Sequence, residues 1–179
     1  MSNTCEAFAA SLLSLSLEAG SEDRVLNEIA EAGKAFTAEP AGLKLLSGYA
    51  LTKDEKAKML DALFYGKMDR YLLSTVKIMA ERCIIGQYAH FARHYEKLYN
   101  EANGILVVEA CSDRELSEKQ KEALTQRMAA LTNKKIKLVT RVDPRVLGGL
   151  RIEYDGKRID DTARRRLQNI ASALARGEA

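Results

Sequence analysis

The chain has 179 residues, with 28 Lys and Arg against 25 Asp and Glu, and this length allows one domain or two small ones. The charged fraction of 30%, the absence of Trp and the two prolines predict a soluble, largely helical protein, and no apolar run approaches the roughly 20 residues of a membrane span. Three widely spaced cysteines, an odd number, argue against a disulfide framework. The N-terminus is unlike a signal peptide, which indicates a chain that is not exported.

The net charge of +3 is divided unevenly along the chain. Residues 1–103 carry 12 basic and 14 acidic side chains, a net of −2, whereas residues 104–179 carry 16 and 11, a net of +5. Either the two parts have solvated surfaces of different composition, or they are two domains with different partners, the second partner being acidic. Charge alone favours the first explanation.

Residues 4–19 predict a helix that is apolar over an unusually wide face. Two neighbouring stripes run along it, one of Phe8, Leu12, Leu15 and Ala19 and the other of Ala9, Leu13 and Leu17. A helix with a single core-facing side needs only one stripe. Either this helix is central and buried by its own bundle, or one stripe faces the core and the other binds a partner helix. The residues leave both possibilities open.

Five further helices are predicted before residue 104. Gly20 ends the first helix and Ser21 is expected to cap the second. Pro40 suits the first turn of a third helix, and Thr52 with Glu55 forms a capping box for a fourth. A fifth helix follows, and the sixth and longest spans about residues 84–102. The residues expected in the core are Val25, Ile29, Ala32, Phe36, Leu43, Leu45, Leu46, Met59, Leu60, Leu63, Phe64, Tyr71, Leu72, Thr75, Ile78, Met79, Tyr88, Phe91, Ala92, Tyr95, Leu98 and Tyr99.

The helical pattern ends at Asn103-Gly104, and the rest of the chain predicts a small α+β domain. A β-rich stretch, GILVVEACS, precedes a capping box that begins at Ser117 and opens a helix to about Leu131. Residues 135–142 then alternate as a strand does, with one face made of Ile136, Leu138, Thr140 and Val142. The order of elements is therefore β-α-β.

A hairpin and a last helix follow this β-α-β segment. Asp155-Gly156 is suited to a two-residue turn, which sets Ile152 opposite Ile159. Asp161 or Thr162 can cap a helix whose apolar stripe is Ala163, Leu167, Ile170, Ala171 and Leu174. The predicted fold is mainly α with a small α+β part: a six-helix bundle over residues 1–104, followed by a β-α-β-hairpin-α domain over residues 105–179.

Motifs that carry chemistry are nearly absent. There is no Gly-rich phosphate loop, and no Ser-His-Asp or Cys-His arrangement has suitable spacing. His90 and His94 share a helical face with Cys83, but there is no HExxH, no fourth ligand is evident, and a polar helix face explains both histidines. We therefore expect no catalytic residue, no metal, no cofactor and no bound small molecule.

A run of arginines, Arg164 to Arg166, raises the possibility of nucleic-acid binding, because consecutive arginines can pair with phosphates. No aromatic residues alternate with these arginines, as a platform for single strands would require. Other lysines extend the basic character: Lys119, Lys121, Lys134, Lys135 and Lys137. A solvated or protein-contacting helix face is the favoured interpretation, and an acidic protein partner fits at least as well as nucleic acid.

Three stretches of this chain are similar to one known family: KMLDALFYGKMDRYLLSTVKIMAERCII, HYEKLYNEANGILVVEACSDRELSEKQKEAL and VDPRVLGGLRIEYDGKRIDDTARRRLQNIASAL. With the order of elements above, the chain resembles the delta subunit of bacterial ATP synthase over roughly residues 4–175. The mitochondrial relative of that subunit is the oligomycin-sensitivity-conferring protein. The chain departs from the family at Asp161 and Thr162, where Gly then Ser is usual, and at Phe8, which replaces a Tyr.

The resemblance implies a non-catalytic stator subunit of a rotary, proton-translocating ATP synthase. Such a subunit is peripheral, at the cytoplasmic face of the bacterial cell membrane, and does not insert into it. The N-terminal helix of an alpha subunit would bind in a groove between the first and fifth helices, for which Phe8, Leu12 and Ile78 are the candidates. The second domain would meet the C-terminus of the b subunit of the peripheral stalk through Arg164 and Arg165. A nucleic-acid-binding module or a generic helical adaptor is the alternative.

Overall fold

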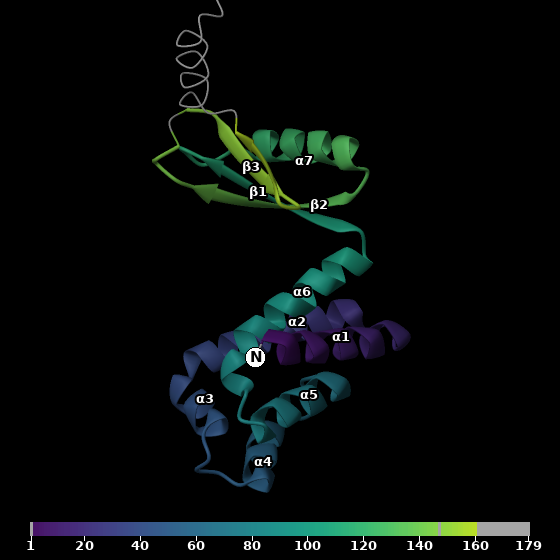
Figure 1. The fold of residues 1–179 in the computed structure, drawn as a ribbon, viewed down its shortest axis with the longest axis vertical. Coiled ribbons are helices and arrows are strands. Elements are labelled where there is room, and N and C mark those ends of the chain that lie inside the picture. Colours follow the sequence, from purple (N-terminus) through teal and green to yellow (C-terminus); the bar gives the residue numbers. More distant parts are fainter. Residues whose placement is uncertain (1, 147, 161–179) are drawn as a thin grey trace, which may run out of the picture. The chain divides into compact units, whose positions relative to one another are not determined.

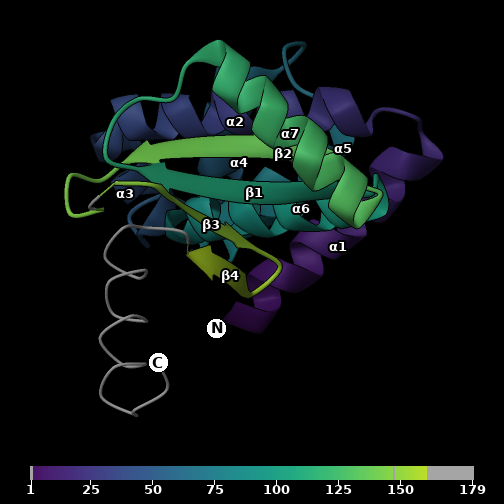
Figure 2. The ribbon, with the colours of Figure 1, turned by 90° about the horizontal axis from the view of Figure 1, so that it is seen from above.

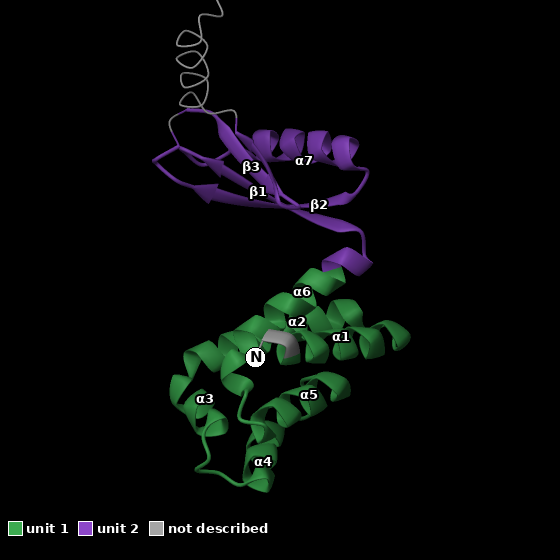
Figure 3. Ribbon diagram, in the orientation of Figure 1, with its two compact units in different colours: residues 1–99 green, residues 100–179 purple. Residues whose placement is uncertain are grey.

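The computed structural model describes residues 2–146 and 148–160 (Figure 1). The chain divides into two compact units, residues 1–99 and 100–179 (Figure 3). The described residues form seven α-helices, one 3-10 turn and four strands. The structure is therefore mostly helical with one small sheet, in agreement with the predicted fold class.

Helices make up the first unit. Their bounds are α1 Ser2–Glu18, α2 Glu22–Ala38, α3 Pro40–Ser47, α4 Lys53–Phe64, α5 Arg70–Glu81, the 3-10 turn η1 Ile85–Gln87 and α6 Tyr88–Ala102. Gly20, with a φ of +62°, allows the turn that separates α1 from α2. The predicted sixth helix is thus preceded by a separate 3-10 turn, because its first turn, which contains Gly86, is wound more tightly.

Side-chain capping explains where α4 begins but not where α2 begins. The predicted box at α4 is confirmed, since Thr52 Oγ1 accepts from the Glu55 N–H at 3.3 Å and Glu55 Oε2 accepts from the Thr52 N–H at 2.8 Å. At α2 the expected cap is wrong in one detail: Ser21 occupies the capping position but its side chain makes no capping hydrogen bond. The reason is its backbone, with φ −121° and ψ 13°, which is not the extended conformation that aims a capping hydroxyl at the helix.

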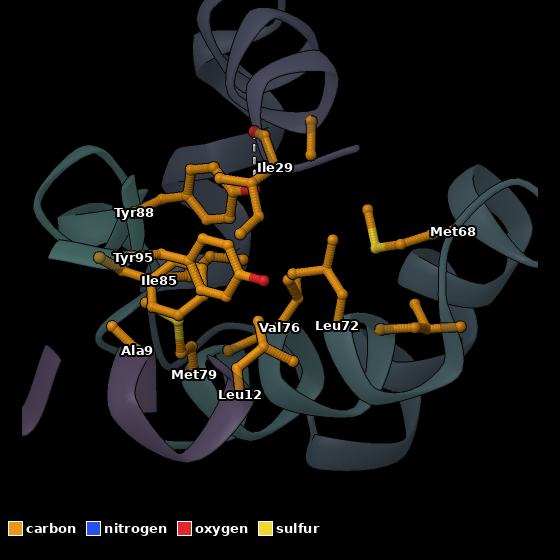
Figure 4. Packing of buried hydrophobic residues seen from close by; sticks show 14 of the residues in the cluster. Ala9, Leu12, Ile29, Met68, Leu72, Val76, Met79, Ile85, Tyr88 and Tyr95 are labelled. Carbon is orange, nitrogen blue, oxygen red and sulfur yellow. Dashed lines mark hydrogen bonds between the residues drawn. The ribbon is translucent and has the colours of Figure 1, made fainter. Parts of the chain in front are cut away.

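The core of the first unit is built around aromatic side chains of α6. Tyr88 lies edge-on to Phe36 with 4.9 Å between ring centroids, and it also contacts Phe91 at 5.6 Å. Its hydroxyl donates to the Ile29 carbonyl at 3.0 Å (Figure 4). Burial raises the pKa of the Tyr88 hydroxyl, so the group stays a neutral donor. These contacts join α2 to α6.

Several residues expected in the core lie at the surface instead. Leu45 is 47% exposed and Leu63 48%, and Ile78, which is also a candidate for the partner groove, is 40% exposed. These helices are short, and the apolar stripe that their sequences encode is wider than the side that neighbouring helices cover. Conversely, Ser16 and Lys56 are buried although their residue types predict the surface.

The second unit contains a four-stranded sheet with one described helix beside it. Its elements are β1 Ile105–Ser112, α7 Glu118–Thr132, β2 Lys135–Val142, β3 Leu150–Tyr154 and β4 Lys157–Asp160. The strand order is β2-β1-β3-β4, with β1 and β2 parallel and the other pairs antiparallel. The helix α7 joins the two parallel strands and lies on one face of the sheet (Figure 2). The predicted capping box of α7 at Ser117 is confirmed.

The predicted alternation of β2 holds for only part of the strand. Ile136 and Leu138 are partly buried, whereas Thr140 is exposed and Val142 is 51% exposed. Because β2 is an edge strand, no neighbouring strand covers its outer side. The buried residues of the sheet are therefore concentrated in the central strand, where Val108 and Ala110 are inaccessible to solvent.

The hairpin follows the predicted register. Ile152 pairs with Ile159, and the turn between the two strands has positive φ at Asp155 (46°) and Gly156 (70°). This geometry requires residues that tolerate positive φ, which Asp and Gly do. The predicted last helix, with Asp161 and Thr162 at its start, lies outside the described residues.

Candidate partner-binding surface

The helix α1 has one buried stripe with a different flank on each side of it. Residues in the stripe are Cys5, Ala9, Leu12, Leu13 and Ser16. At 3.6 residues per turn, Phe8 and Leu15 lie on one flank of this stripe, while Glu6 and Leu17 lie on the other. The two apolar stripes predicted from the sequence therefore both contribute to the core, and each also reaches an exposed edge.

Side-chain contacts identify the neighbour of each flank. Glu6 Oε1 lies 3.6 Å from Nε2 of His94, so the Glu6 flank faces α6. The guanidinium of Arg82 lies over the Phe8 ring, 5.7 Å from its centroid. Arg82 follows directly on α5, and α1 packs against α5. The flank with Phe8 and Leu15 therefore faces α5.

The helix α5 is flanked in the same way. Lys77 Nζ lies 2.6 Å from Oδ1 of Asp61, so this side of α5 faces α4. Tyr71, Ile78 and Arg82 recur at helical spacing on the opposite flank, the one that meets α1. Two predicted site residues, Phe8 and Ile78, are therefore brought to the same junction between two helices.

We call this junction the α1–α5 seam and define it by Phe8, Leu12, Leu15, Tyr71 and Ile78. Leu15 is 39% exposed and Ile78 is 40% exposed, and both Phe8 and Tyr71 are partly exposed. Four large apolar side chains that each retain exposed area along one helix–helix junction make a surface suited to a partner with an apolar face.

Leu12 differs from the other members of the seam. It is only 1% exposed, and its side chain points into the core toward Val76 and Met79 of α5 (Figure 4). It therefore forms the floor of the seam and supports its shape. Leu15, seven residues from Phe8 on the same stripe, was not among the residues predicted for this surface, whereas Leu12 was.

Two arginines border the seam through cation–π contacts. Besides Arg82 at Phe8, the Arg70 guanidinium lies 4.5 Å from the centroid of Tyr71 and donates to its hydroxyl at 2.7 Å. An arginine over an aromatic face fixes the ring and leaves a positive charge beside it. The seam thus combines apolar area with positive charge, which suits a helix that carries apolar and acidic residues.

Metal ligation finds no support in the geometry of the described residues, where no group of three His, Cys, Asp or Glu side chains could hold a metal ion. His94 faces Glu6, and the Cys83 sulfur lies 3.2 Å from Nζ of Lys56. Over the same residues, no helix has the length and apolar character needed to cross a membrane.

The second unit presents charge on the sheet face opposite Val108 and Ala110. Oε1 of Glu153 lies 3.5 Å from Nε of Arg151 and 3.6 Å from Nε of Arg158. Lys134, Lys135 and Lys137 are exposed in the second unit, and Nζ of Lys121 lies 2.8 Å from Oε1 of Glu118. Arg164 and Arg165, the predicted contacts of this unit, lie outside the described residues.

A family model decides what kind of protein carries this seam. The model described as ATP synthase delta (OSCP) subunit matches residues 6–174, nearly the whole chain. The chain belongs to this family. The family resemblance predicted from the sequence is therefore confirmed. Delta subunits are a non-catalytic part of the ATP synthase complex.

Individual delta subunits are similar to this one along most of their length. "ATP synthase subunit delta" of Cytophaga hutchinsonii is 26% identical over 163 residues, covering 91% of this chain and 89% of its own. The protein of the same name from Chlorobium luteolum is 26% identical over 172 residues, covering 96% and 95%. The similarity therefore includes both units.

A solved structure has the same fold. A chain in the cryo-EM structure of the Toxoplasma gondii mitochondrial ATP synthase hexamer superposes with a TM-score of 0.69 at 14% sequence identity. The match covers 96% of this delta-family chain and 97% of the other. At this identity the likeness concerns the fold, which extends across both units.

Proposed function

We propose that this delta-family chain is a stator subunit of a rotary, proton-translocating ATP synthase, linking the catalytic head to the peripheral stalk and resisting the torque of rotation. The family match over residues 6–174 supports this proposal. In a bacterial cell the subunit would lie at the cytoplasmic face of the membrane, as a peripheral part of the complex.

In this proposal, residues 1–104 bind the N-terminal helix of an alpha subunit at the α1–α5 seam. The observation that carries it is the half-exposed apolar area of Leu15 and Ile78 beside Phe8, at a junction of two helices. An amphipathic helix could cover this area with its apolar face, while Arg70 and Arg82 meet acidic side chains at its edges. Leu12 supports the floor and has little surface to offer a partner directly.

In the second part of the proposal, residues 105–179 bind the C-terminus of the b subunit. The net charge of +5 over residues 104–179 supports an acidic partner. Arg164 and Arg165 remain the proposed contacts, together with the exposed lysines Lys135 and Lys137. Salt-dependent binding is expected for such a surface.

The seam assignment can be tested by titrating the full chain with a synthetic peptide of the alpha subunit's N-terminus. Replacing Ile78 by Asp should weaken binding about 10- to 100-fold, since burial of a large apolar side chain is worth about 1.5–3 kcal/mol. Leu15→Asp should act in the same direction. Calorimetry or fluorescence anisotropy gives the dissociation constants.

Leu17→Asp is the matched control. Leu17 lies on the same helix as Leu15 and is similarly exposed, at 45%, but it is on the opposite flank. Its replacement should leave the dissociation constant within about twofold. Equal losses of affinity for the peptide in the Leu15 and Leu17 variants, or unchanged affinity in the Ile78 variant, would contradict the assignment. Circular dichroism establishes that all variants are folded.

A further inference from the structure

A lysine is buried in the first unit without a carboxylate partner. Lys56 of α4 is 3% exposed, and its Nζ donates to the carbonyls of Gly48 at 2.7 Å and Ala80 at 3.0 Å. The remaining acceptor is Sγ of Cys83, at 3.2 Å. These three acceptors account for the three protons of an ammonium group.

No negative charge faces this ammonium group among the described residues. Its contacts are two neutral carbonyl oxygens and one sulfur, and no carboxylate lies within ion-pair distance of Nζ. Removing an ammonium group from water is costly unless an opposite charge compensates it. The one contacting group that can become negatively charged is the thiol of Cys83.

Cys83 has an unusual backbone and some access to solvent. It follows the end of α5 with a φ of +58°, a conformation that a residue other than Gly or Asn rarely adopts. Its side chain is partly exposed, and its thiol donates to the Gly48 carbonyl at 3.5 Å. This backbone places the sulfur at the end of the lysine side chain.

The other two cysteines lack both solvent access and a buried ammonium group in contact with the sulfur. Cys5 is 1% exposed and donates to Gln87 Oε1 at 3.4 Å, and burial raises the pKa of its thiol. Cys111 is 8% exposed, in the central strand of the sheet. Of the three thiols, only that of Cys83 combines solvent access with a buried ammonium group in contact with sulfur.

We propose that Cys83 is a modification site, a thiol that hydrogen peroxide oxidises to a sulfenic acid, with Lys56 as the residue that activates it. An ammonium group in contact with sulfur stabilises the negative charge of the attacking thiolate. This proposal is independent of the stator function, because neither Lys56 nor Cys83 is among the residues that define the seam.

The chemistry of this step is a two-electron oxidation. The sulfur of the thiolate attacks one oxygen of the peroxide, so that an S–O bond forms and the O–O bond breaks. Sulfur loses two electrons, and the second oxygen leaves as hydroxide and takes up a proton to become water. An external thiol reverses the modification by forming a mixed disulfide with loss of water and then exchanging it.

Oxidation changes the hydrogen bonds that hold three segments together. Lys56 joins α4 to the turn at Gly48 and to the end of α5 at Ala80. The oxygen added to Cys83 must fit into this cluster, next to Arg82, whose guanidinium lies over Phe8. The modification site is thus adjacent in sequence to a residue that borders the α1–α5 seam.

The decisive measurement compares the full chain in its native state with the same chain unfolded in urea, at one pH. Hydrogen peroxide is added, sulfenic acids are trapped with dimedone, and each cysteine is followed by peptide mass spectrometry. Cys83 should react about tenfold faster in the native protein, because unfolding removes the ammonium group from the sulfur. Cys5 and Cys111 should react more slowly in the native protein than in the unfolded chain. A native rate for Cys83 no higher than its unfolded rate would overturn the proposal, whatever the variants show.

Variants at Lys56 then identify the activating group. Lys56→Met should lower the native rate of Cys83 about tenfold, and Lys56→Arg, which keeps the positive charge, should restore most of it. Circular dichroism shows whether each variant is folded. If folded Lys56→Met protein reacts as fast as the wild type, Lys56 is not the activating residue and the proposal fails.

Discussion

In the turn after β2, one arginine, Arg145, lowers the pKa of the Asp143 carboxyl. Both the guanidinium and the backbone N–H of Arg145 donate to the Asp143 carboxylate, at 3.0–3.1 Å. The Arg145 side chain lowers the pKa of this carboxyl to about 2, against an ordinary value of 3.8. The hydrogen bonds between the Asp143 carboxylate and Arg145 stabilise the turn that follows β2. The backbone N–H of Asp143 also donates to the Ser112 carbonyl at 2.9 Å.

The lowered pKa of Asp143 makes the stability of the folded protein depend on pH in a direction that can be stated. The pKa of Asp143 is lower in the folded protein than in the unfolded chain. The ionised Asp143 carboxylate therefore stabilises the folded state above pH 3.8, and this stabilisation is lost as the pH falls toward 2. Arg145→Ala should raise the pKa of Asp143 back toward 3.8, as measured by NMR titration of its carboxyl carbon. Arg158→Ala, which removes a partner of Glu153, should leave it unchanged. An unchanged pKa in the Arg145 variant would show that another group lowers it.

At the same scale, Phe8 illustrates what a departure from the family pattern changes. The family resemblance implies a tyrosine at this position, and this chain lacks the tyrosine hydroxyl. The ring nevertheless contacts the guanidinium of Arg82, a contact that needs only the aromatic face. The apolar and cation–π properties of the position are therefore retained without a hydroxyl.

At the scale of single elements, the helix start at Thr52 provides a direct measure of capping. The Thr52 backbone N–H bonds the Glu55 carboxylate and lowers its pKa, while the Thr52 hydroxyl caps the Glu55 N–H. Thr52→Ala should lower the free energy of unfolding by about 1 kcal/mol, as measured by chemical denaturation.

Thr37→Ala is the control for this capping experiment. The Thr37 hydroxyl bonds only the Gly33 carbonyl of its own helix, four residues earlier, at an exposed position. Its removal should change stability by less than about 0.5 kcal/mol. If both variants lose equal stability, the capping box contributes nothing beyond an ordinary side-chain hydrogen bond.

Local signals in the sequence were sufficient to predict these elements. The Thr52–Glu55 and Ser117–Gln120 boxes and the Asp155-Gly156 turn act over two to four residues, so their chemistry can be read without knowing the neighbours. Burial depends on distant segments instead. Leu63 is exposed and Lys56 is buried in the same helix, and only the positions of the neighbouring helices decide between them.

The candidate site was predictable in the same partial way. Helical spacing together with the resemblance placed Phe8 and Ile78 at one junction, where the structure also has them. The spacing could not show that Leu12 is in the core while Leu15 retains exposed area, because both lie on one stripe. Nor did any pattern indicate the contact between Lys56 and Cys83, which are 27 residues apart.

At the scale of the whole molecule, the proposed function requires that two partners bind at once. We expect an immobilised peptide from the C-terminus of the b protein to capture the alpha-subunit peptide only when the full chain is present. Arg164→Glu with Arg165→Glu should abolish capture of the chain by the b peptide, yet leave its affinity for the alpha peptide unchanged. Surface plasmon resonance measures both steps in one experiment.

The same double variant separates the stator proposal from the alternative function. A nucleic-acid-binding module would lose retention of DNA or RNA when the two arginines are replaced, with strong salt dependence in the wild type. Binding to nucleic acid at physiological salt without capture by the b peptide would favour the alternative and contradict the stator proposal.

The connection between α6 and β1 consists of two residues, Asn103 and Gly104. The strand entered there is internal to the sheet and is hydrogen-bonded to β2 along its whole length and to β3 over its second half. A force passed along the chain from α6 would therefore enter the sheet through β1, a strand that is held by backbone hydrogen bonds on both of its sides.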